Sequence, residues 1–518
     1  MLRPLKSQNS LIKNFLLCSL SALLLIFSFP DLNLWILAWF AFVPLFLAVK
    51  DQSQKRAFLL SYLSGVIFWW GTIYWLVHVT LIGTIILILY LALYFGLFGL
   101  FISSVLRRES SFAHFLLVPS FWVILEYVRG HLFTGFPWAL LGYSQYLNLP
   151  VIQVSDITGA WGVSFLVMTV NTLIYSVVGC QLSVVNLARR IIFVALLVSF
   201  VLGYGYFKLS QEKSEAGKGQ PIRVSVIQGD IPQEMKWSPA YQGFILGKYL
   251  ELSTLAAQEK PDLIVWPEAA APGILGEDNW VFDEIFSFAS GIQVPLVVGS
   301  VVEEKGRYFG SALFISAEGK VLSRYDKIHR VPFGEYVPLK KIFPFLASVV
   351  PIGDIDKGKE FTVFSLRRTT SRLRGATDIK FAVLDCFEDL FPELSSEFVG
   401  RGADFLINIT NDAWYKKTSA PLQHLQASVF RAVENRVPLA RSANTGVSGF
   451  IRSSGKVSYL CAGEGCVKIF VPGHKTEELT LALRKKKSFY TRFPDAFILF
   501  CAFCFVYDII MRLLKQKE

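Results

Sequence analysis

Long apolar runs follow one another through the first 210 residues of the chain, and they limit the folds that it can adopt. A helix needs about 20 consecutive apolar residues to cross the hydrocarbon core of a bilayer. Seven runs of this kind precede residue 210, and an eighth lies near the C-terminus. They lie near 11–30, 33–49, 57–78, 82–106, 111–128, 160–180, 190–207 and 490–512. We therefore expect a multi-pass α-helical membrane domain of about eight spans.

Basic residues are distributed unevenly among the connections between these runs. Every second connection is basic, and the others contain few Lys or Arg, with Arg129 the main exception. The basic connections contain Arg3, Lys6, Lys13, Lys50, Lys55, Arg56, Arg107, Arg108, Arg189, Arg190, Arg512, Lys515 and Lys517. Because basic loops stay in the cytoplasm, both termini are predicted to be cytoplasmic and the block from about 208 to 488 extracytoplasmic. The same loops explain much of the net charge of +11, so a nucleic-acid partner is not expected.

The pattern of the sequence changes after residue 207. Residues 208–220 are polar and contain Gly, which indicates a linker between the membrane domain (1–207) and the next domain. From 221 to 488, short β-branched strands alternate with helices predicted at 240–258, 280–290 and 421–435. Strands that are apolar nearly throughout are typical of a buried sheet covered by helices, so an α/β sandwich is predicted. Residues 489–518 are predicted to form the last membrane helix and a cytoplasmic tail.

Three strand ends carry a carboxylate, an ammonium and a thiol. Glu268 follows an apolar strand in IVWPEAA, Lys327 begins a Pro- and Gly-rich loop, and Cys386 ends the strand in FAVLDCFED. A thiol near a helix N-terminus and beside a lysine is expected to form the reactive thiolate at a lower pH than a free cysteine. Each residue alone is more often structural or merely exposed. Their joint occurrence favours a catalytic site.

The order of these residues resembles the catalytic triad of the nitrilase superfamily, whose domain is an αββα sandwich. With such a domain placed before the last of eight spans, essentially the whole chain resembles the bacterial apolipoprotein N-acyltransferases. Further segments similar to that family are EYVRG (126–130), GFPWALLGY (135–143), QGDIPQEMKW (228–237), VPFGEYVP (331–338), TNDAW (410–414) and RSANTGVS (441–448).

This resemblance implies a role for each residue of the triad. Glu268 would be the general base, Lys327 would stabilise the oxyanion and Cys386 would carry the acyl group. Glu335, in VPFGEYVP, would support the triad.

The same resemblance implies that Trp237, Phe387 and Glu388 contact substrate. Phe387 departs from the Tyr that many members carry at this position, so a hydroxyl is lost while the ring is kept. TNDAW also continues as YKKT instead of the more usual stretch similar to FGDS, which puts in doubt the local loop that faces substrate.

The implied reaction moves an acyl chain from a phospholipid, through a Cys386 thioester, to the N-terminal amine of the diacylglyceryl cysteine of a lipoprotein precursor. It needs no metal and no cofactor, and the resemblance implies a monomer in the bacterial inner membrane. An alternative is a membrane-tethered nitrilase-type amidase that uses the same triad to hydrolyse an amide. A transporter or scaffold with an inactive domain is disfavoured because all three catalytic residue types are present. In addition, the spans carry few charges beyond Glu126 and Arg129, whereas coupled transporters tend to carry ionisable residues near mid-membrane.

Several smaller features remain. The apolar stretch 342–351 either rests on the outer leaflet or is a buried loop. Glu126 and Arg129 stand three apart and are expected to hold the loop 129–159. Whether Cys461 and Cys466 form a disulfide stays open, whereas Cys18, Cys180, Cys501 and Cys504 are interpreted as packing residues. His329 and His424 are interpreted as loop or helix-surface histidines, so no metal site is expected.

Overall fold

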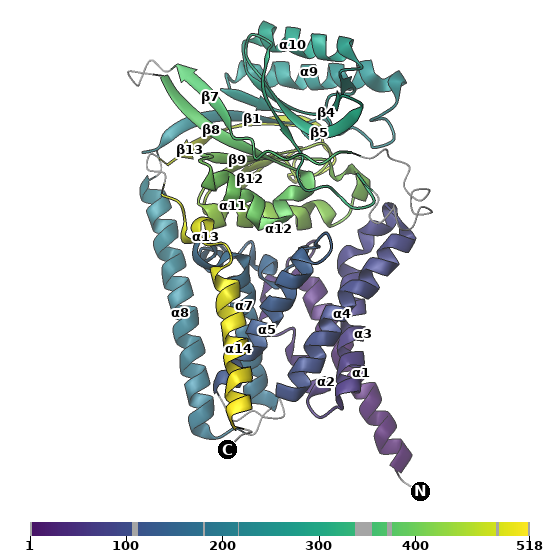
Figure 1. Cartoon of the computed structure of the whole chain (residues 1–518), viewed down its shortest axis with the longest axis vertical. Coiled ribbons are helices and arrows are strands. Elements are labelled where there is room, and N and C mark those ends of the chain that lie inside the picture. The colour runs from purple at the N-terminus through teal and green to yellow at the C-terminus, as the bar shows by residue number, and fades with distance from the viewer. Residues whose placement is uncertain are drawn as a thin grey trace. The chain divides into compact units, whose positions relative to one another are not determined.

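The computed structural model describes residues 3–105, 112–179, 182–215, 217–336, 355–369, 376–482 and 486–515. The chain forms two compact units, whose elements are labelled in Figure 1. The first unit comprises Met1–Ser210 together with Phe493–Glu518, and the second comprises Gln211–Arg492. The predicted apolar stretch 342–351 lies outside the described residues.

The first unit is built from helices. Its elements are α1 (Arg3–Ser28), η1 (Trp35–Trp39), α2 (Val43–Val49), α3 (Gln54–Ile73), η2 (Tyr74–His78), α4 (Leu81–Val105), α5 (Phe112–His131), η4 (Leu141–Gln145), α6 (Leu149–Ile152), α7 (Ser155–Gly179), α8 (Val184–Glu215) and α14 (Ala496–Lys515). Within the described ranges, five segments are long and apolar enough to cross a membrane: Leu11–Ser28, Gln54–His78, Leu81–Val105, Ser155–Gly179 and Val184–Glu215. Trp35–Val49 and Ala496–Asp508 are shorter apolar helices. The expected apolar helical domain is therefore present.

The apolar run predicted at 33–49 is divided between η1 and α2. Pro44 lies in the first turn of α2. Proline fits the first turn of a helix but not its interior, so a new helix begins here. Asn171 of α7 binds the backbone at this break, since its amide donates to the carbonyl of Ala38 at 2.8 Å and accepts from the N–H of Phe42 at 2.8 Å. Such internal pairing is what a backbone within lipid requires.

Helix α8 is longer than the span predicted at 190–207. It begins at Val184 and continues to Glu215, so it includes more than half of the predicted linker 208–220. The segment KLSQEKSE contains neither Gly nor Pro, and Lys, Leu, Gln and Glu are good helix formers. A polar composition alone therefore does not end the helix.

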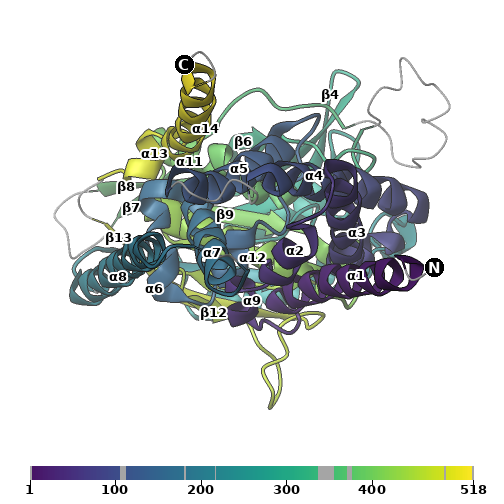
Figure 2. The ribbon, with the colours of Figure 1, turned by 90° about the horizontal axis from the view of Figure 1, so that it is seen from below.

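Helices of the first unit approach one another closely. Figures 1 and 2 show α1, α2 and α3 side by side. A Cβ added at Gly99 of α4 would lie only 2.7 Å from the carbonyl oxygen of Ala57 in α3. Small residues at such crossings are typical of helices packed in a membrane, where close van der Waals contact replaces the hydrophobic effect.

The second unit contains two sheets. The seven-stranded sheet has the order β13-β1-β2-β4-β5-β6, with β3 paired to β4, and the six-stranded sheet has the order β12-β11-β10-β9-β8-β7. The first consists of β1 (Gln220–Gln228), β2 (Leu263–Val265), β3 (Ile274–Leu275), β4 (Leu296–Glu304), β5 (Arg307–Ile315), β6 (Val321–Asp326) and β13 (Gly473–Leu481). The second consists of β7 (Phe364–Thr369), β8 (Ala376–Asp385), β9 (Phe405–Thr410), β10 (Leu439–Ala443), β11 (Gly449–Ile451) and β12 (Val457–Tyr459).

The two sheets face one another between layers of helices. The Ser442 hydroxyl of β10 donates to the carbonyls of Ile227 in β1 at 2.8 Å and Val265 in β2 at 3.1 Å. Figure 1 shows α9 (Gln242–Gln258) and α10 (Asn279–Ile292) on one side, and α11 (Pro392–Gly400) and α12 (Ala420–Asn435) on the other. The predicted α/β sandwich is present, and α9, α10 and α12 confirm the three predicted helices.

The central strands of the six-stranded sheet position the segments that follow them. β8 pairs with β9, and β9 with β10, in parallel. Every residue of β9 and β10 is buried, as expected for a parallel sheet covered on both faces. Because parallel strands end at the same edge, the residues after β8 and β9 lie close together; they begin the short helices η7 (Cys386–Leu390) and η8 (Asp412–Tyr415).

The cysteines have different environments. Cys461 and Cys466 form a disulfide, which decides the alternative that the sequence leaves open. Cys18 and Cys501 are free and buried in the first unit, as expected of packing residues, and Cys504 is partly exposed. Cys180 lies outside the described residues.

Candidate active site

The residues of the predicted triad lie just beyond the ends of three strands. Glu268 follows β2, Lys327 directly follows β6 and Cys386 directly follows β8. β2 and β6 belong to the seven-stranded sheet and β8 to the six-stranded sheet. The candidate site is therefore built from both sheets of the sandwich.

Lys327 lies at the centre of the polar contacts. Its Nζ is 2.6 Å from Glu335 Oε1, 3.3 Å from Glu268 Oε1 and 3.8 Å from Asp385 Oδ1. Burial opposes the charged form, but these carboxylates, Glu335 foremost, hold the pKa of Lys327 well above its ordinary value. The ammonium is thus a buried positive charge, with the Lys327 side chain 1% exposed.

Glu335 is oriented by its own loop. Its Oε2 accepts a hydrogen bond from the N–H of Val331 at 2.8 Å, while its Oε1 accepts from Lys327. With both oxygens bound, the carboxylate is held against the ammonium. The structure thus brings Glu335 into contact with Lys327; its supporting role stays a prediction.

The thiol of Cys386 is almost completely buried, at 9% exposure. Burial and the charge of Glu268 raise the pKa of the Cys386 thiol well above its ordinary value, and Lys327 offsets this only in part. The expectation that this thiol ionises at a lower pH than a free cysteine is therefore wrong, because it took account of the lysine but not of burial and the carboxylates. A base must remove the proton before this sulfur can act as a nucleophile.

The backbone of Cys386 is in the left-handed region, with φ of +53°. This conformation costs a non-glycine residue roughly 1–2 kcal/mol. Asn408 of β9 supports it, because its side-chain amide donates to the carbonyl of Cys386 at 3.1 Å and to that of Leu384 at 3.1 Å. On the side-chain end, the Thr410 hydroxyl donates to Cys386 Sγ at 3.2 Å.

Glu388 is buried and fully bonded within the protein. It is 0% exposed. Its carboxylate accepts hydrogen bonds from the Tyr325 hydroxyl and from the backbone N–H groups of Ile328, His329 and Asp385. It therefore connects the turn after Cys386 to the loop after Lys327. This geometry favours a structural role over the substrate contact that the sequence resemblance implies.

The two aromatic residues predicted to contact substrate differ in exposure. Phe387 is 8% exposed and its ring lies 5.2 Å from that of Phe391 and 6.1 Å from that of His329. Trp237, in contrast, is 51% exposed and is available to a ligand. His329 is a loop residue as predicted, and its ring centroid lies 3.6 Å from that of Phe391, with the two ring planes tilted by 30°.

Lys236 is a second lysine at the site, and the sequence reasoning missed it. Its side chain is 3% exposed and its Nζ donates to the backbone carbonyl of Glu268 at 2.7 Å. Burial lowers the pKa of Lys236 to about 8, although the charges of Glu268 and Cys386 act in the opposite direction. The signal was present, since Lys236 immediately precedes Trp237 in QGDIPQEMKW.

His424 is not on a helix surface, contrary to the sequence interpretation. It lies in α12 and is 2% exposed, with Asp389 and Asp412 within hydrogen-bond distance of its ring. Polar side chains of α12 lie in the interior, where they form hydrogen bonds and ion pairs with residues from distant segments of the chain. Periodicity within the helix cannot reveal such partners.

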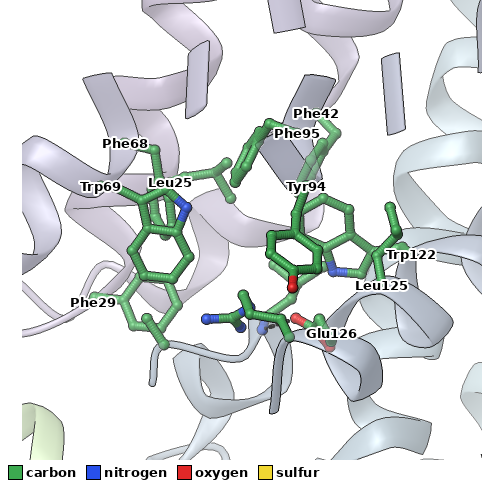
Figure 3. Close-up of a pocket in the computed structure, with 13 residues that line it drawn as sticks. Leu25, Phe29, Phe42, Phe68, Trp69, Tyr94, Phe95, Trp122, Leu125 and Glu126 are labelled. Atoms are coloured by element: carbon green, nitrogen blue, oxygen red, sulfur yellow. Dashed lines mark hydrogen bonds between the residues drawn. The ribbon is translucent and has the colours of Figure 1, made fainter. Parts of the chain in front are cut away.

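The first unit holds a separate polar pair next to a small cavity (Figure 3). Glu126 accepts from the N–H of Leu141 at 2.7 Å, and Arg129 donates to the carbonyl of Trp138 at 2.7 Å. Both residues therefore hold the loop 129–159, as predicted. The cavity beside them has about 20 Å³ of space, which is room for about one water molecule and too little for an acyl chain.

Comparisons with known proteins agree along most of the chain. Residues 21–173 match the family model described as apolipoprotein N-acyltransferase N-terminal domain, and residues 223–487 match the model described as carbon-nitrogen hydrolase. The apolipoprotein N-acyltransferase of Geobacter metallireducens is 37% identical, with 94% of this chain and 93% of that protein covered. That of Haemophilus ducreyi is 30% identical, with 83% of this chain and 85% of that protein covered. That of Brucella melitensis is 32% identical, with 82% of each chain covered.

Proposed function

Because the chain belongs to the apolipoprotein N-acyltransferase family, we propose that it transfers an acyl chain from a phospholipid to the N-terminal amine of the diacylglyceryl cysteine of lipoprotein precursors. The observation that supports this most directly is the Lys327 ammonium, held between Glu268 and Glu335 beside the turn that carries Cys386. A base, a cation and a buried thiol in this arrangement are suited to acyl transfer through a thioester.

In the first half-reaction, Glu268 takes the proton from Cys386 Sγ and the thiolate attacks an ester carbonyl of the phospholipid. Lys327 stabilises the oxyanion, and a donor of this kind lowers the barrier by about 3 kcal/mol. When the C–O bond breaks, Glu268 returns the proton to the leaving lysophospholipid oxygen. The acyl group stays on Cys386 as a thioester, and the need for a base agrees with the raised pKa of this thiol.

In the second half-reaction, the amine of the lipoprotein precursor attacks the thioester carbonyl, and Lys327 again faces the oxyanion. Glu268 takes a proton from the attacking nitrogen as the C–N bond forms and gives it to the departing thiolate of Cys386. The enzyme returns to its starting state, so the kinetics are ping-pong. Trp237, exposed beside Lys236, and the nearly buried Phe387 are the proposed substrate contacts, and Glu388 is assigned to the frame of the site.

We further propose the topology that the basic connections predict. Seven spans within 1–207 precede the catalytic domain at 221–488, residues 208–220 connect the two, and 489–518 contain the eighth span. Both termini would lie in the cytoplasm and the catalytic domain outside, in the inner membrane of a bacterium, with the protein acting as a monomer. The apolar helices among the described residues and the alternation of basic loops support this arrangement.

The test follows the acyl group by mass. Purified full-length protein incubated with phospholipid is expected to gain one acyl mass that hydroxylamine removes and that Cys386→Ala abolishes. Cys504→Ala, which changes a partly exposed cysteine of the first unit, is the matched control and should keep the adduct. Added diacylated lipopeptide should then take the acyl group. Absence of the adduct would contradict the proposal, and discharge to water alone would favour the amidase alternative.

A further inference from the structure

A ring of buried charges lies behind the turn that carries Cys386. His424 Nε2 is 2.8 Å from Asp389 Oδ1, and Nδ1 of the same ring is 2.9 Å from Asp412 Oδ1. Arg441 closes the ring, with its guanidinium 2.9 Å from Asp389 Oδ2 and 3.5 Å from Asp412 Oδ2. All four side chains are at most 2% exposed.

The contacts fix the protonation state of His424. A carboxylate oxygen only accepts hydrogen bonds, so both ring nitrogens of His424 must donate. The ring is therefore an imidazolium, and the four side chains together are electrically neutral. Burial opposes the charge, but Asp389 and Asp412 raise the pKa of His424 to about 9. The charges of His424 and Arg441, working against burial, hold the pKa values of Asp389 and Asp412 below their ordinary range.

The imidazolium of His424 also contacts the backbone carbonyl of Cys386, the proposed nucleophile. The N–H of His424 Nε2 is shared between Asp389 Oδ1 at 2.8 Å and the carbonyl oxygen of Cys386 at 3.3 Å, and Asn408 donates to the same carbonyl at 3.1 Å. This carbonyl belongs to the residue with φ of +53°. The ring of charges thus connects η7, η8, α12 and β10 to the carbonyl of Cys386.

We propose that His424 is a positioning residue for acyl transfer: as an imidazolium between Asp389 and Asp412, it holds the carbonyl of Cys386 and so keeps the thiol aimed at its base and cation. This proposal rests on the proposed function, since it takes Cys386 as the nucleophile. It assigns His424 no contact with substrate.

Two double variants distinguish the position of the hydrogen-bond donor at residue 424 from the charge of the buried cluster. His424→Gln/Asp412→Asn keeps a donor near the place of Nε2, whereas His424→Asn/Asp412→Asn keeps one near the place of Nδ1. Both pairs remove one positive and one negative charge, so the buried cluster stays neutral and should fold, which thermal unfolding of the full-length protein checks. The single variant His474→Gln is the control, because this histidine lies in β13, is 20% exposed and pairs with Glu259.

The readouts are the rate of thioester formation from phospholipid and the pH profile of Cys386 alkylation by iodoacetamide, followed on the Cys386 peptide by mass. We expect the double variant with Asn to lose roughly 10- to 100-fold in thioester formation at unchanged KM, and the double variant with Gln to recover most of it. Both double variants lose the Asp412 charge, which raises the pKa of Cys386, so they are compared with each other: the alkylation profile of the Asn variant should lie at higher pH than that of the Gln variant, because only the Asn variant lacks the donor that holds Cys386 next to Lys327. Equal rates in the two double variants, both near wild type or both low, would overturn the proposal. If wild type forms no thioester, the proposed function fails, and the alkylation profiles still decide the role of His424.

Discussion

Glu335 Oε1 lies 2.6 Å from Lys327 Nζ, closer to the ammonium than Glu268 Oε1 is at 3.3 Å. The candidate base is therefore not the main counter-charge of the cation. In the proposed mechanism, Glu335 would neutralise Lys327 and leave Glu268 able to exchange a proton with Cys386.

Glu335→Gln tests this division of roles. The amide keeps the size of the side chain and removes the charge that contributes most to raising the pKa of Lys327. We expect thioester formation to fall by about 10- to 100-fold and the alkaline limb of the rate profile to move to lower pH, because Lys327 loses its proton more readily. Single-turnover rates from pH 6 to 10 measure both, with exposed Glu360→Gln as control. An alkaline limb that stays in place would contradict the assignment.

The charge on His424 predicts how stability depends on pH. Its pKa is raised from 6.5 to about 9 in the folded protein, so the native state binds more protons than the unfolded state between these values. The stabilisation is complete below pH 6.5 and disappears as pH rises through about 9, a change on the order of 3 kcal/mol. Thermal unfolding from pH 6 to 10 should show a steeper loss for wild type than for His424→Gln. Parallel curves would show that the histidine does not titrate in this way.

Lys236 predicts a different response to pH. Its pKa is about 8, so its ammonium is present at pH 7 and largely lost at pH 9. Lys236→Met should therefore slow thioester formation at pH 7, by roughly 10-fold, and have little effect relative to wild type at pH 9. Exposed Lys456→Met should have no effect at either pH. A defect of equal size at both values would mean that packing, and not charge, is what the lysine contributes.

The ring of Phe387 is held by its neighbours, which predicts the outcome of two substitutions. Phe387→Tyr should change the rate of thioester formation by less than about threefold, since the ring stays packed on Phe391 and the added hydroxyl is not needed by the fold. Phe387→Ala should lower the free energy of unfolding by roughly 3 kcal/mol through the cavity it leaves. A large gain or loss of rate with Tyr would show that the hydroxyl itself contacts substrate.

The residues of the candidate site that could be located from the sequence are those that follow the ends of strands. Glu268, Lys327 and Cys386 could each be located because an apolar strand ends beside each of them, and strand ends bring distant residues together. The ionisation of Cys386 was predicted wrongly because burial is a property of the assembled sandwich. His424 was assigned wrongly to a surface for the same reason, since its partners come from other elements, whereas Lys236 was missed although it lies in a segment that the resemblance had singled out.

Among the helices, apolar composition predicted which segments are helical better than where they end. Pro44 divides the second apolar run between η1 and α2, although the hydropathy of that run is continuous. Helix α8 passes through a polar segment because helix propensity, and not hydropathy, decides its end. Boundaries of this kind depend on single residues and not on the average character of a segment.

The closed ring of Asp389, Asp412, His424 and Arg441 also limits how this chain can change by single substitutions. Replacing any one member would leave an uncompensated charge in the interior, so evolution has few single steps out of the arrangement. Lineages that have lost the histidine should have lost an aspartate as well, and the positions should vary in pairs or not at all. Such paired substitutions would show that the buried cluster has to remain electrically neutral.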